Sequence, residues 1–384
     1  MSLDEVRRHR IVTTHTGSLP RPDRLSALLF ANRPEDSAER ARQIRQAVAD
    51  IVARQIDLGI DVVSDGEQSK VSFQVYALHR LAGVERVTPK PGERVTRENA
   101  AFPVFYEGGV HPGSAQARFA CTGPIAYTGE ALLAADLANL KSALAGHDPV
   151  DVFVPAVSPS SLASQMVNQY YNREEDHVIA CAEALRVEYE AIVAAGFQLQ
   201  IDDPRLAMHY MLSPGLSVEE TRAWTRARIE ILNDALRNIP PARVRHHTCY
   251  GINMGPRTSD FELKYLADLI LEIHADYYSF EMANPRHEHE WRVWQDAKLP
   301  AHKILVPGCI THASVIVEHP ELVAERIVRL AGVVGRERVM ASTDCGFAST
   351  LTPGKRPEVE AEIVWAKFAS LVEGARLASN RLWR

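Results

Sequence analysis

The sequence predicts an α/β fold, a single (β/α)8 TIM barrel, on three observations. Eight short runs rich in β-branched and apolar residues are spread along the chain, and helix-period stretches fill most of the intervals between them. No break in composition divides the 384 residues. The alternative is a doubly wound open sheet, which usually has a glycine-rich phosphate turn after its first strand. The first run ends in HTGSLP, which lacks that pattern, so the barrel is favoured.

The eight predicted strands follow one another through the whole chain. Each is short enough for a barrel strand and ends near a glycine, a proline or a cluster of polar residues. The predicted strands cover residues 11–17, 61–67, 151–157, 198–202, 244–250, 277–283, 303–310 and 338–346.

Three of the predicted helices have recognisable N-terminal residues. Side chains that accept hydrogen bonds from free backbone N–H groups favour such positions, and proline is tolerated in a first turn. These helices are 173–196 with Asn172 as the N-cap, 217–238 with Ser217 and Glu220 as a capping box, and 357–379 with Pro357 in the first turn.

The interval between the second and third predicted strands is irregular. At about 70–148 it is longer than a barrel unit needs, and it contains TRENAAFPVFYEGG and ARFACTGPIAYTG, which resemble a hairpin or a small subdomain. We therefore expect residues 1–384 to form a single domain with an insertion at this point.

Composition limits the classes of function. The net charge of −6 argues against a nucleic-acid partner and against an anionic membrane surface. The first residues lack the apolar core of a secretion signal, and no apolar run is long enough to span a membrane. The five cysteines are odd in number and far apart, which indicates reduced thiols in a cytoplasmic protein. They are Cys121, Cys181, Cys249, Cys309 and Cys345.

Ionisable side chains gather where the predicted strands end. In a barrel of this kind, the chemistry takes place at the carboxyl ends of the strands. A packed core would have valine or isoleucine there, so the set as a whole indicates a functional site. Its members are His15, Thr16, Ser18, Asp65, Glu67, Asp202, Asp203, His247, Cys249, Glu281, His312, Asp344 and Cys345.

The run HHTCYG contains the strongest candidates for metal ligands. Alternate residues of a strand share a face, so His247 and Cys249 point into the same mouth while His246 points away. With Cys345 and Glu281 from later strands, they make a plausible tetrahedral zinc shell, and thiolates favour zinc over magnesium or calcium. A buried cysteine is more often a packing residue than a ligand. Spacing alone leaves both interpretations open.

Other residues of these types are interpreted as structural. HEHE (287–290) lacks the paired histidines of a metalloprotease helix and is predicted to be a polar loop or the start of a helix. Cys121, Cys181 and Cys309 are predicted to be packing residues.

Taken together, the strand ends resemble the C-terminal catalytic barrel of cobalamin-independent methionine synthase, here in a short stand-alone form. The resemblance covers nearly the whole chain, and the order of HTC, FE and DCG is its most specific part. The matching motifs, in the family's order, are TTHTGSLPRP (13–22), SDGE (64–67), QIDDP (200–204), HTC (247–249), SFE (279–281), ITH (310–312) and DCG (344–346).

The resemblance implies a role for each of nine residues. Zn²⁺ is the implied cofactor, and the implied partners are a homocysteine-like thiol and an alkyl donor, a folate or another compound. The implied zinc ligands are His247, Cys249, Glu281 and Cys345; the implied contacts with the amino-acid substrate are Thr16, Ser18, Glu67 and Asp202; and the implied general acid is His312.

The resemblance therefore implies zinc-dependent transfer of a methyl or other alkyl group to a thiol, most simply homocysteine to give methionine. The family's folate platform includes a tryptophan shortly after the third strand, but AVSPSSLASQMVNQYY (156–171) has none. The alternatives are a thiol transferase of the same family with another thiol or electrophile, such as an epoxide, and a barrel lyase or binding protein with a structural zinc. The donor and the oligomeric state stay open.

Overall fold

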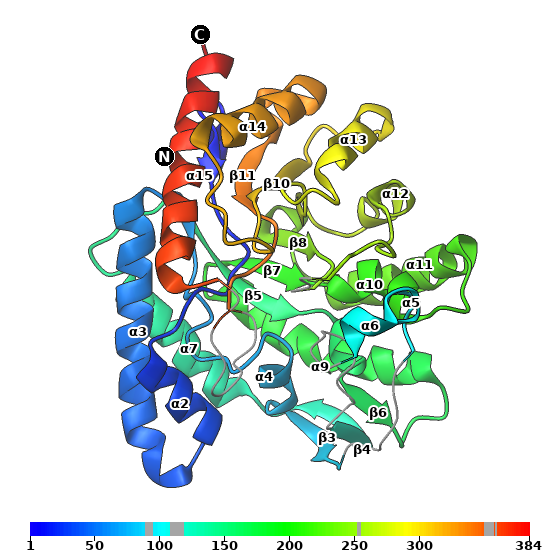
Figure 1. The fold of residues 1–384 in the computed structure, drawn as a ribbon. Coiled ribbons are helices and arrows are strands. Elements are labelled where there is room, and N and C mark those ends of the chain that lie inside the picture. Colours follow the sequence, from blue (N-terminus) through cyan, green and yellow to red (C-terminus); the bar gives the residue numbers. More distant parts are fainter. Residues whose placement is uncertain (89–94, 108–118, 252–254, 349–356, 358) are drawn as a thin grey trace.

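Eight parallel strands form a nearly closed barrel in the computed structural model (Figure 1). The structure describes residues 1–88, 95–107, 119–251, 255–348, 357 and 359–384. Each strand falls within one of the predicted runs, so the predicted barrel is confirmed. In sheet order the strands are β1 (Val12–Thr13), β11 (Met340–Thr343), β10 (Ile304–Ile310), β9 (Tyr277–Phe280), β8 (Val244–Thr248), β7 (Gln198–Asp202), β5 (Asp151–Val157) and β2 (Val62–Val63).

The seam between β1 and β2 is held partly by a side chain. The Asp61 carboxylate accepts hydrogen bonds from the backbone N–H (2.8 Å) and the hydroxyl (3.0 Å) of Thr13, and Asp61 N donates to Thr13 O (3.2 Å). The Thr14 hydroxyl donates to Val62 O (3.0 Å). Both strands are shorter than predicted, because the residues after them leave the ladder. Those residues are thereby free to line the mouth of the barrel.

Helices surround the barrel (Figure 1). Because the strands are covered on both faces, they are buried nearly throughout, and this includes the polar residues of β7 and β8. None of the helices in the described ranges combines the length and apolarity that crossing a membrane requires. The helices are α1 (Leu3–Arg7), α2 (Asp23–Ala31), α3 (Ser37–Leu58), α4 (Val75–Leu78), α5 (Arg97–Ala101), α6 (Pro103–Tyr106), α7 (Glu130–Ala143), α8 (Pro159–Ala163), α9 (Glu174–Ala194), α10 (Pro204–Leu212), α11 (Val218–Ala235), α12 (Ala267–Ile270), α13 (Val293–Asp296), α14 (Pro320–Val334) and α15 (Ala361–Leu382), with short 3-10 turns at Pro34–Asp36, Pro241–Arg243, Leu263–Tyr265, Glu288–Arg292 and Arg336–Arg338.

The predicted helix starts are right in one case and wrong in two. The capping box of Ser217 at the start of α11 is confirmed. Asn172 is not the N-cap of α9: Arg173 takes that position without a side-chain hydrogen bond, and three acidic residues in the first turn complement the helix dipole instead. Pro357 precedes α15, whose N-cap is Glu360, so the predicted start is four residues too early.

The predicted hairpin is present between β2 and β5. β3 (Leu81–Arg86) pairs antiparallel with β4 (Phe119–Tyr127), and β6 (Met166–Asn168), which comes after β5, joins β4 in parallel. The register shifts at Gly83, where φ is +77° and an added Cβ would lie 2.4 Å from Pro124 O. Treating the whole chain as one domain with this insertion stays a prediction.

A buried ionic cluster fastens the insertion to the barrel helices. The Arg80 guanidinium donates to Glu188 of α9 (3.0 Å) and to Asp136 of α7 (2.5 Å). The hydroxyls of Tyr76 and Tyr127 also donate to the Glu188 carboxylate, at 2.8 and 2.7 Å. Because the charges are paired and the Glu188 carboxylate accepts three hydrogen bonds, this cluster holds the insertion firmly against α7 and α9.

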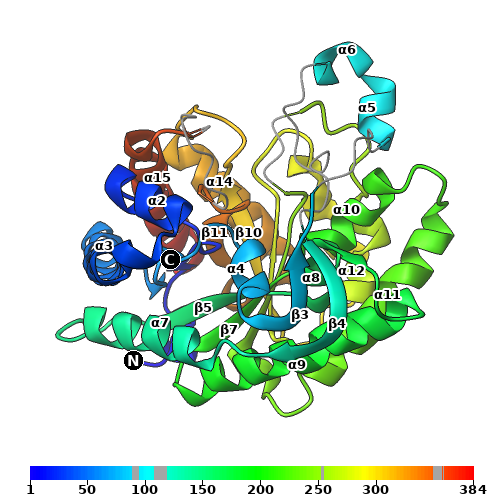
Figure 2. The same ribbon diagram turned by 90° about the horizontal axis from the view of Figure 1, so that it is seen from below.

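Helices α5 and α6 project from the barrel beyond α10 (Figure 2). Arg97 donates to the carbonyls of Tyr210 (3.0 Å) and Leu216 on the neighbouring segment. Glu98 is buried and accepts a hydrogen bond from Thr258 N (2.8 Å). The projecting helices are therefore tied directly to the segment that follows β8.

Gly308 in β10 lies against Asp344, the residue that follows β11, and Gly308→Ala is expected to destabilise the barrel. An added Cβ would lie 2.0 Å from Asp344 Oδ1 and 2.7 Å from the Asp344 backbone. The Asp344 carboxylate would lose its hydrogen bonds from the N–H groups of Met282 and Ala283, both 2.7 Å. We expect a loss of about 3 kcal/mol in the free energy of unfolding, measured by urea denaturation.

Gly332→Ala is the matched control. This glycine is inside α14, and no heavy atom lies within 4 Å of the added Cβ. Alanine is the better helix former, so stability should be unchanged or rise by up to about 1 kcal/mol. Equal effects of the two substitutions would contradict the close approach at Gly308.

Candidate metal centre and substrate pocket

Three of the predicted metal ligands meet at the mouth of the barrel. His247, Cys249 and Cys345 are buried, and their ligand atoms all lie within 4.8 Å of one another. The two sulfur atoms are 3.4 Å apart, too far for a disulfide bond. The ring of His247 is oriented by a hydrogen bond between Nδ1 and the Ser279 hydroxyl (3.0 Å). The cluster is thus supplied by the carboxyl ends of β8 and β11, which are separated in the sheet by β9 and β10.

The donor set fits a thiophilic metal ion. Nε2 of His247 is buried without a hydrogen-bond partner among the described residues, as an imidazole awaiting a ligand would be. The hydrogen bond from Cys345 holds the pKa of Cys249 well below its usual range. Two sulfur atoms and an imidazole nitrogen are ligand atoms of the kinds that zinc binds.

The fourth predicted ligand, Glu281, lies outside this cluster. Its Oε1 accepts a hydrogen bond from Tyr250 N (2.9 Å), and its Oε2 accepts from Arg257 Nη2 and Asn284 Nδ2, both at 2.8 Å. Burial raises the pKa of Glu281, and the Arg257 charge opposes that effect. Glu281 as a ligand stays a prediction, because the structure places its carboxylate on other partners.

All four predicted substrate contacts line one pocket. Its empty volume is about 360 Å³, and the sulfur atoms and His247 form part of its wall. Phe73 is an aromatic member of the wall that the sequence did not indicate. The pocket is lined by Thr16, Ser18, Glu67, Phe73, Asp202, Pro204, His247, Cys249, Gly251, Cys345 and Gly346.

Two of these side chains, Glu67 and Asp202, are buried carboxylates in one electrostatic environment. Burial, with a smaller contribution from the Glu67 charge, raises the pKa of Asp202 to about 7. Burial also raises the pKa of Glu67, whose Oε2 has no hydrogen-bond partner among the described residues. Gln200 Nε2 donates to Asp202 (2.8 Å) and so fixes one of its oxygens. Paired carboxylates whose pKa values are raised by burial, although Lys70 and His247 oppose the shift, suit a cationic group of a substrate.

The backbone around Glu67 brings its carboxylate into the pocket. Glu67 has φ of +55°, an uncommon conformation for a residue other than glycine. Gly17, with φ of +122°, leaves the room: an added Cβ would lie 2.8 Å from Glu67 Oε1. Arg21 holds the turn by donating to Glu67 O from Nε (3.1 Å) and Nη2 (2.7 Å).

The hydroxyl side of the pocket is formed by the segment after β1. The hydroxyls of Thr16 and Thr343 share a hydrogen bond of 3.1 Å. Ser18 Oγ accepts a hydrogen bond from Ala348 N (3.3 Å), and Phe347 N donates to Ser18 O (3.0 Å). Thr16 is thus held by the last residue of β11, and Ser18 by the segment that follows this strand.

The predicted general acid, His312, is buried near the centre but is not part of the pocket wall. Neither of its ring nitrogens has a hydrogen-bond partner among the described residues. Burial lowers its pKa to about 4, although the Asp344 charge opposes the shift. The ring is therefore neutral at pH 7.

Two further histidines and three further cysteines are buried in the core or outside the metal-ligand cluster. His15 turns into the core, where it hydrogen-bonds to Gln55 (2.7 Å) and contacts Phe153. His246 is buried and lies outside the metal-ligand cluster, on the face opposite His247, as predicted. The predictions for three cysteines are confirmed, since all are buried in the main apolar core: Cys121, Cys181 and Cys309.

Three residues of the site lie outside the predicted strands and were not among the predicted site residues. Phe73 lines the pocket from the segment after β2, and Arg257 and Asn284 contact Glu281 from the segments after β8 and β9. Asn284 lies three residues after Glu281, in the ANP run, and could have been noticed as a polar residue at a strand end. Arg257 has no comparable signal, because the direction of its side chain depends on the turn.

The family comparison agrees with this geometry. Residues 161–367 match the model of the cobalamin-independent synthase catalytic domain. A methionine synthase of Saccharolobus islandicus is 24% identical over 380 residues, which cover 97% of this chain and 96% of that protein. A methionine synthase of Thermococcus kodakarensis is 23% identical over 392 residues and is covered to 94%.

Solved structures share the fold over nearly the whole chain. A B12-independent methionine synthase from Shewanella sp. W3-18-1, in complex with selenomethionine, has a TM-score of 0.74 and 20% identity, and covers 97% of this chain and 99% of its own. A protein described as a putative vitamin-B12 independent methionine synthase from Listeria monocytogenes has a TM-score of 0.65 and 19% identity, covering 98% and 99%. The chain therefore belongs to the cobalamin-independent synthase family, with the barrel of its catalytic domain, and is a methionine synthase-like methyltransferase.

Proposed function

We propose that the protein uses zinc to transfer a methyl group to a thiol, most simply that of homocysteine, with methionine as the product. The observation that carries the proposal is the position of His247, Cys249 and Cys345 in the wall of a pocket that also contains Glu67 and Asp202. A purely structural metal site would not need two buried carboxylates beside it. The names of the relatives agree with this reaction.

His247, Cys249 and Cys345 would hold the zinc ion, with Glu281 as the predicted fourth ligand. When bound, zinc supplies the positive charge that keeps a substrate thiol deprotonated and in place. The three residues orient the metal-binding face toward the pocket, and the Ser279 hydroxyl fixes the His247 ring. These assignments rest on the donor set and on the family resemblance.

The pocket residues would bind the amino-acid part of the substrate. Glu67 and Asp202 offer negative charge to an ammonium group, and the ammonium group would in turn lower their raised pKa values. Thr16 and Ser18 present hydroxyl groups on the other side, which suits a carboxylate. An α-amino acid with a thiol side chain satisfies both sides and the metal at once.

His312 would protonate the leaving group of the donor. Its pKa of about 4 means that the ring carries no charge at pH 7, so it has to gain a proton as the substrates bind. Additional negative charge beside the ring, such as a bound thiolate, favours that gain.

The donor is the open part of the proposal. The stretch 156–171 has no tryptophan, and Phe73 is the aromatic residue in the described pocket wall. This favours, as a second candidate, a transferase of the same family that uses another methyl or alkyl donor, such as an epoxide. We propose that the thiol side is retained in either case.

A donor screen tests the function. The zinc-loaded protein is incubated with homocysteine and, separately, methylfolates, methylcobalamin, S-methyl donors and epoxides, with thioether products measured by mass spectrometry. We expect metal-dependent formation of methionine with one methyl donor; an S-alkyl product from an epoxide alone supports the second candidate. No product with any donor, together with unfolding when a chelator removes the metal, would indicate a structural zinc instead.

A further inference from the structure

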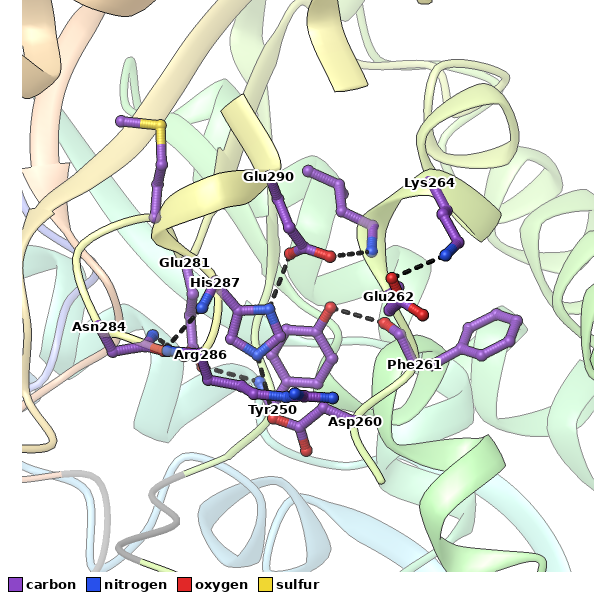
Figure 3. A network of polar contacts seen from close by, with 12 residues as sticks. Tyr250, Asp260, Phe261, Glu262, Lys264, Glu281, Asn284, Arg286, His287 and Glu290 are labelled. Atoms are coloured by element: carbon purple, nitrogen blue, oxygen red, sulfur yellow. Dashed lines mark hydrogen bonds and ion pairs between the residues drawn. The ribbon is translucent and has the colours of Figure 1, made fainter. Parts of the chain in front are cut away.

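The Glu281 carboxylate is held by three hydrogen-bond donors and lies outside the cluster of His247, Cys249 and Cys345. Tyr250 N donates to Oε1 at 2.9 Å, while Arg257 Nη2 and Asn284 Nδ2 both donate to Oε2 at 2.8 Å (Figure 3 shows Glu281, Tyr250 and Asn284). The Glu281 side chain has an exposed fraction of 0%. A buried carboxylate in this position has a complete set of partners without a metal ion.

Arg257 is itself held by a chain of buried ionisable residues, namely Asp260, His287 and Glu290. Its Nε donates to Asp260 Oδ2 at 2.8 Å, and the same oxygen lies 3.0 Å from His287 Nε2. The other ring nitrogen of His287 lies 2.7 Å from Glu290, as Figure 3 shows. Arg257 is 4% exposed and has φ of +58°. A residue in this backbone conformation, held at both ends, has a set orientation.

We propose that Arg257 is a positioning residue that holds Glu281 in a released position, so that the thiol substrate takes the fourth place beside His247, Cys249 and Cys345. This inference rests on the proposed function, because it describes how that site admits its thiol. In this arrangement the Glu281 carboxylate lies outside the ligand cluster, so it would have to move and give up some of these hydrogen bonds in order to bind the metal ion. The two arrangements are therefore alternatives, and Arg257 stabilises the one in which the metal is open.

The chemistry explains why an arginine serves this role. A carboxylate that leaves a metal ion inside a protein becomes a buried charge, which is costly unless a cation receives it. The planar guanidinium meets two carboxylates at once, Asp260 through Nε and Glu281 through Nη2. Its Nη1 is buried without a partner among the described residues, which leaves a further donor for the arriving carboxylate.

The test uses the full chain loaded with Co²⁺, whose sulfur-to-metal absorption bands report each thiolate bound. Homocysteine is titrated into the wild type, Arg257→Gln, Glu281→Gln and the double variant. In Arg257→Gln we expect the dissociation constant for homocysteine to rise at least about tenfold, because Glu281 now competes for the metal. Adding Glu281→Gln should restore it to within about threefold of the wild type, as a coupled pair requires.

If the role of Arg257 is purely structural, adding Glu281→Gln should not restore the affinity for homocysteine. The double variant would then bind homocysteine as weakly as Arg257→Gln or more weakly, and that result would overturn the inference. If Arg257→Gln fails to fold, Arg257→Lys takes its place, since lysine keeps the charge but cannot contact two carboxylates as the guanidinium does. Homocysteine affinity is then compared between Arg257→Lys and the double variant Arg257→Lys/Glu281→Gln. Circular dichroism establishes the fold of each variant.

Arg286→Gln is the matched control. Arg286 is exposed, and its side chain donates to Thr258 O (3.1 Å) rather than to Glu281. Homocysteine affinity should be unchanged in this variant.

Two outcomes separate the proposed function from the inference about Arg257. If homocysteine leaves the spectrum of the wild-type cobalt protein unaltered, the proposed function fails. If the wild type binds and Arg257→Gln binds equally well, the inference about Arg257 alone fails.

Discussion

Cys345→Ser is expected to leave the protein folded and almost free of metal. Serine replaces a polarisable thiolate by a hydroxyl that stays protonated at neutral pH and reaches less far toward the shared position beside Cys249. Even residues that only support a metal ligand contribute 10- to 100-fold to affinity, so loss of a ligand should weaken zinc binding by more than about 100-fold. Metal content by mass spectrometry and a competition titration with a chelator measure the effect, and methyl transfer should fall with it.

Cys181→Ser separates the loss of a ligand from the cost of a buried hydroxyl. Cys181 is fully buried in α9, within the main apolar core and outside the metal-ligand cluster. This variant should lose roughly 1–3 kcal/mol of stability and keep its full metal content. If Cys345→Ser instead bound zinc as tightly as the wild type, the assignment of the cluster as the metal centre would be wrong.

Asp202→Asn is expected to make the metal-free protein more stable and the enzyme less active. Burial raises the folded-state pKa of Asp202 to about 7, well above its ordinary value. Below the ordinary value both states are protonated, and the effect is absent. As pH rises through the window up to about 7, the unfolded chain loses its proton first, so the native state of the wild type loses stability.

Above that window the asparagine variant should be more stable by up to roughly 4 kcal/mol, since the pKa rises from 3.8 to about 7 and each pKa unit corresponds to about 1.4 kcal/mol. Its KM for homocysteine should rise about 10- to 100-fold, because the ammonium group loses a charged partner. Urea unfolding at pH 4 and pH 8, with steady-state kinetics, measures both effects. A stability difference that shrinks as pH rises would contradict the sign.

Asp203→Asn is the neighbouring control for the kinetic part. Asp203 is buried too, and burial raises its pKa to about 6, but it accepts a hydrogen bond from the Ser161 hydroxyl (3.1 Å) and does not line the pocket. Its substitution should affect stability while leaving the KM for homocysteine within about threefold of the wild type, as for a residue outside the site.

The features that follow from strand periodicity could be predicted from the sequence. Alternation placed His247 and Cys249 on one face and His246 on the other, and the rule that barrel sites lie at strand ends brought Cys345 to them. The same rule gathered Glu67 and Asp202 in one pocket. These predictions depend only on which strand a residue ends and on which face it lies.

What could not be predicted depends on the conformation of the connecting segments. Glu281 ends a strand as expected, but the partners of its carboxylate come from the turns that contain Arg257 and Asn284. Arg257 has a left-handed backbone conformation, which glycine or asparagine would indicate in a sequence but arginine does not. The N-cap of α9 was wrong for a related reason: acidic residues in its first turn do what a capping side chain was expected to do.

The hydrogen bond between Glu98 and Thr258 joins the projecting helices α5 and α6 to the residue next to Arg257. If Arg257 sets the balance between two positions of Glu281, these helices and the metal centre are thermodynamically linked. A molecule that binds preferentially to one arrangement of α5 would then shift thiol affinity, and a bound thiol would shift the affinity for that molecule by the same factor. The insertion between β2 and β5 is thus where an effector could act on the reaction without entering the pocket.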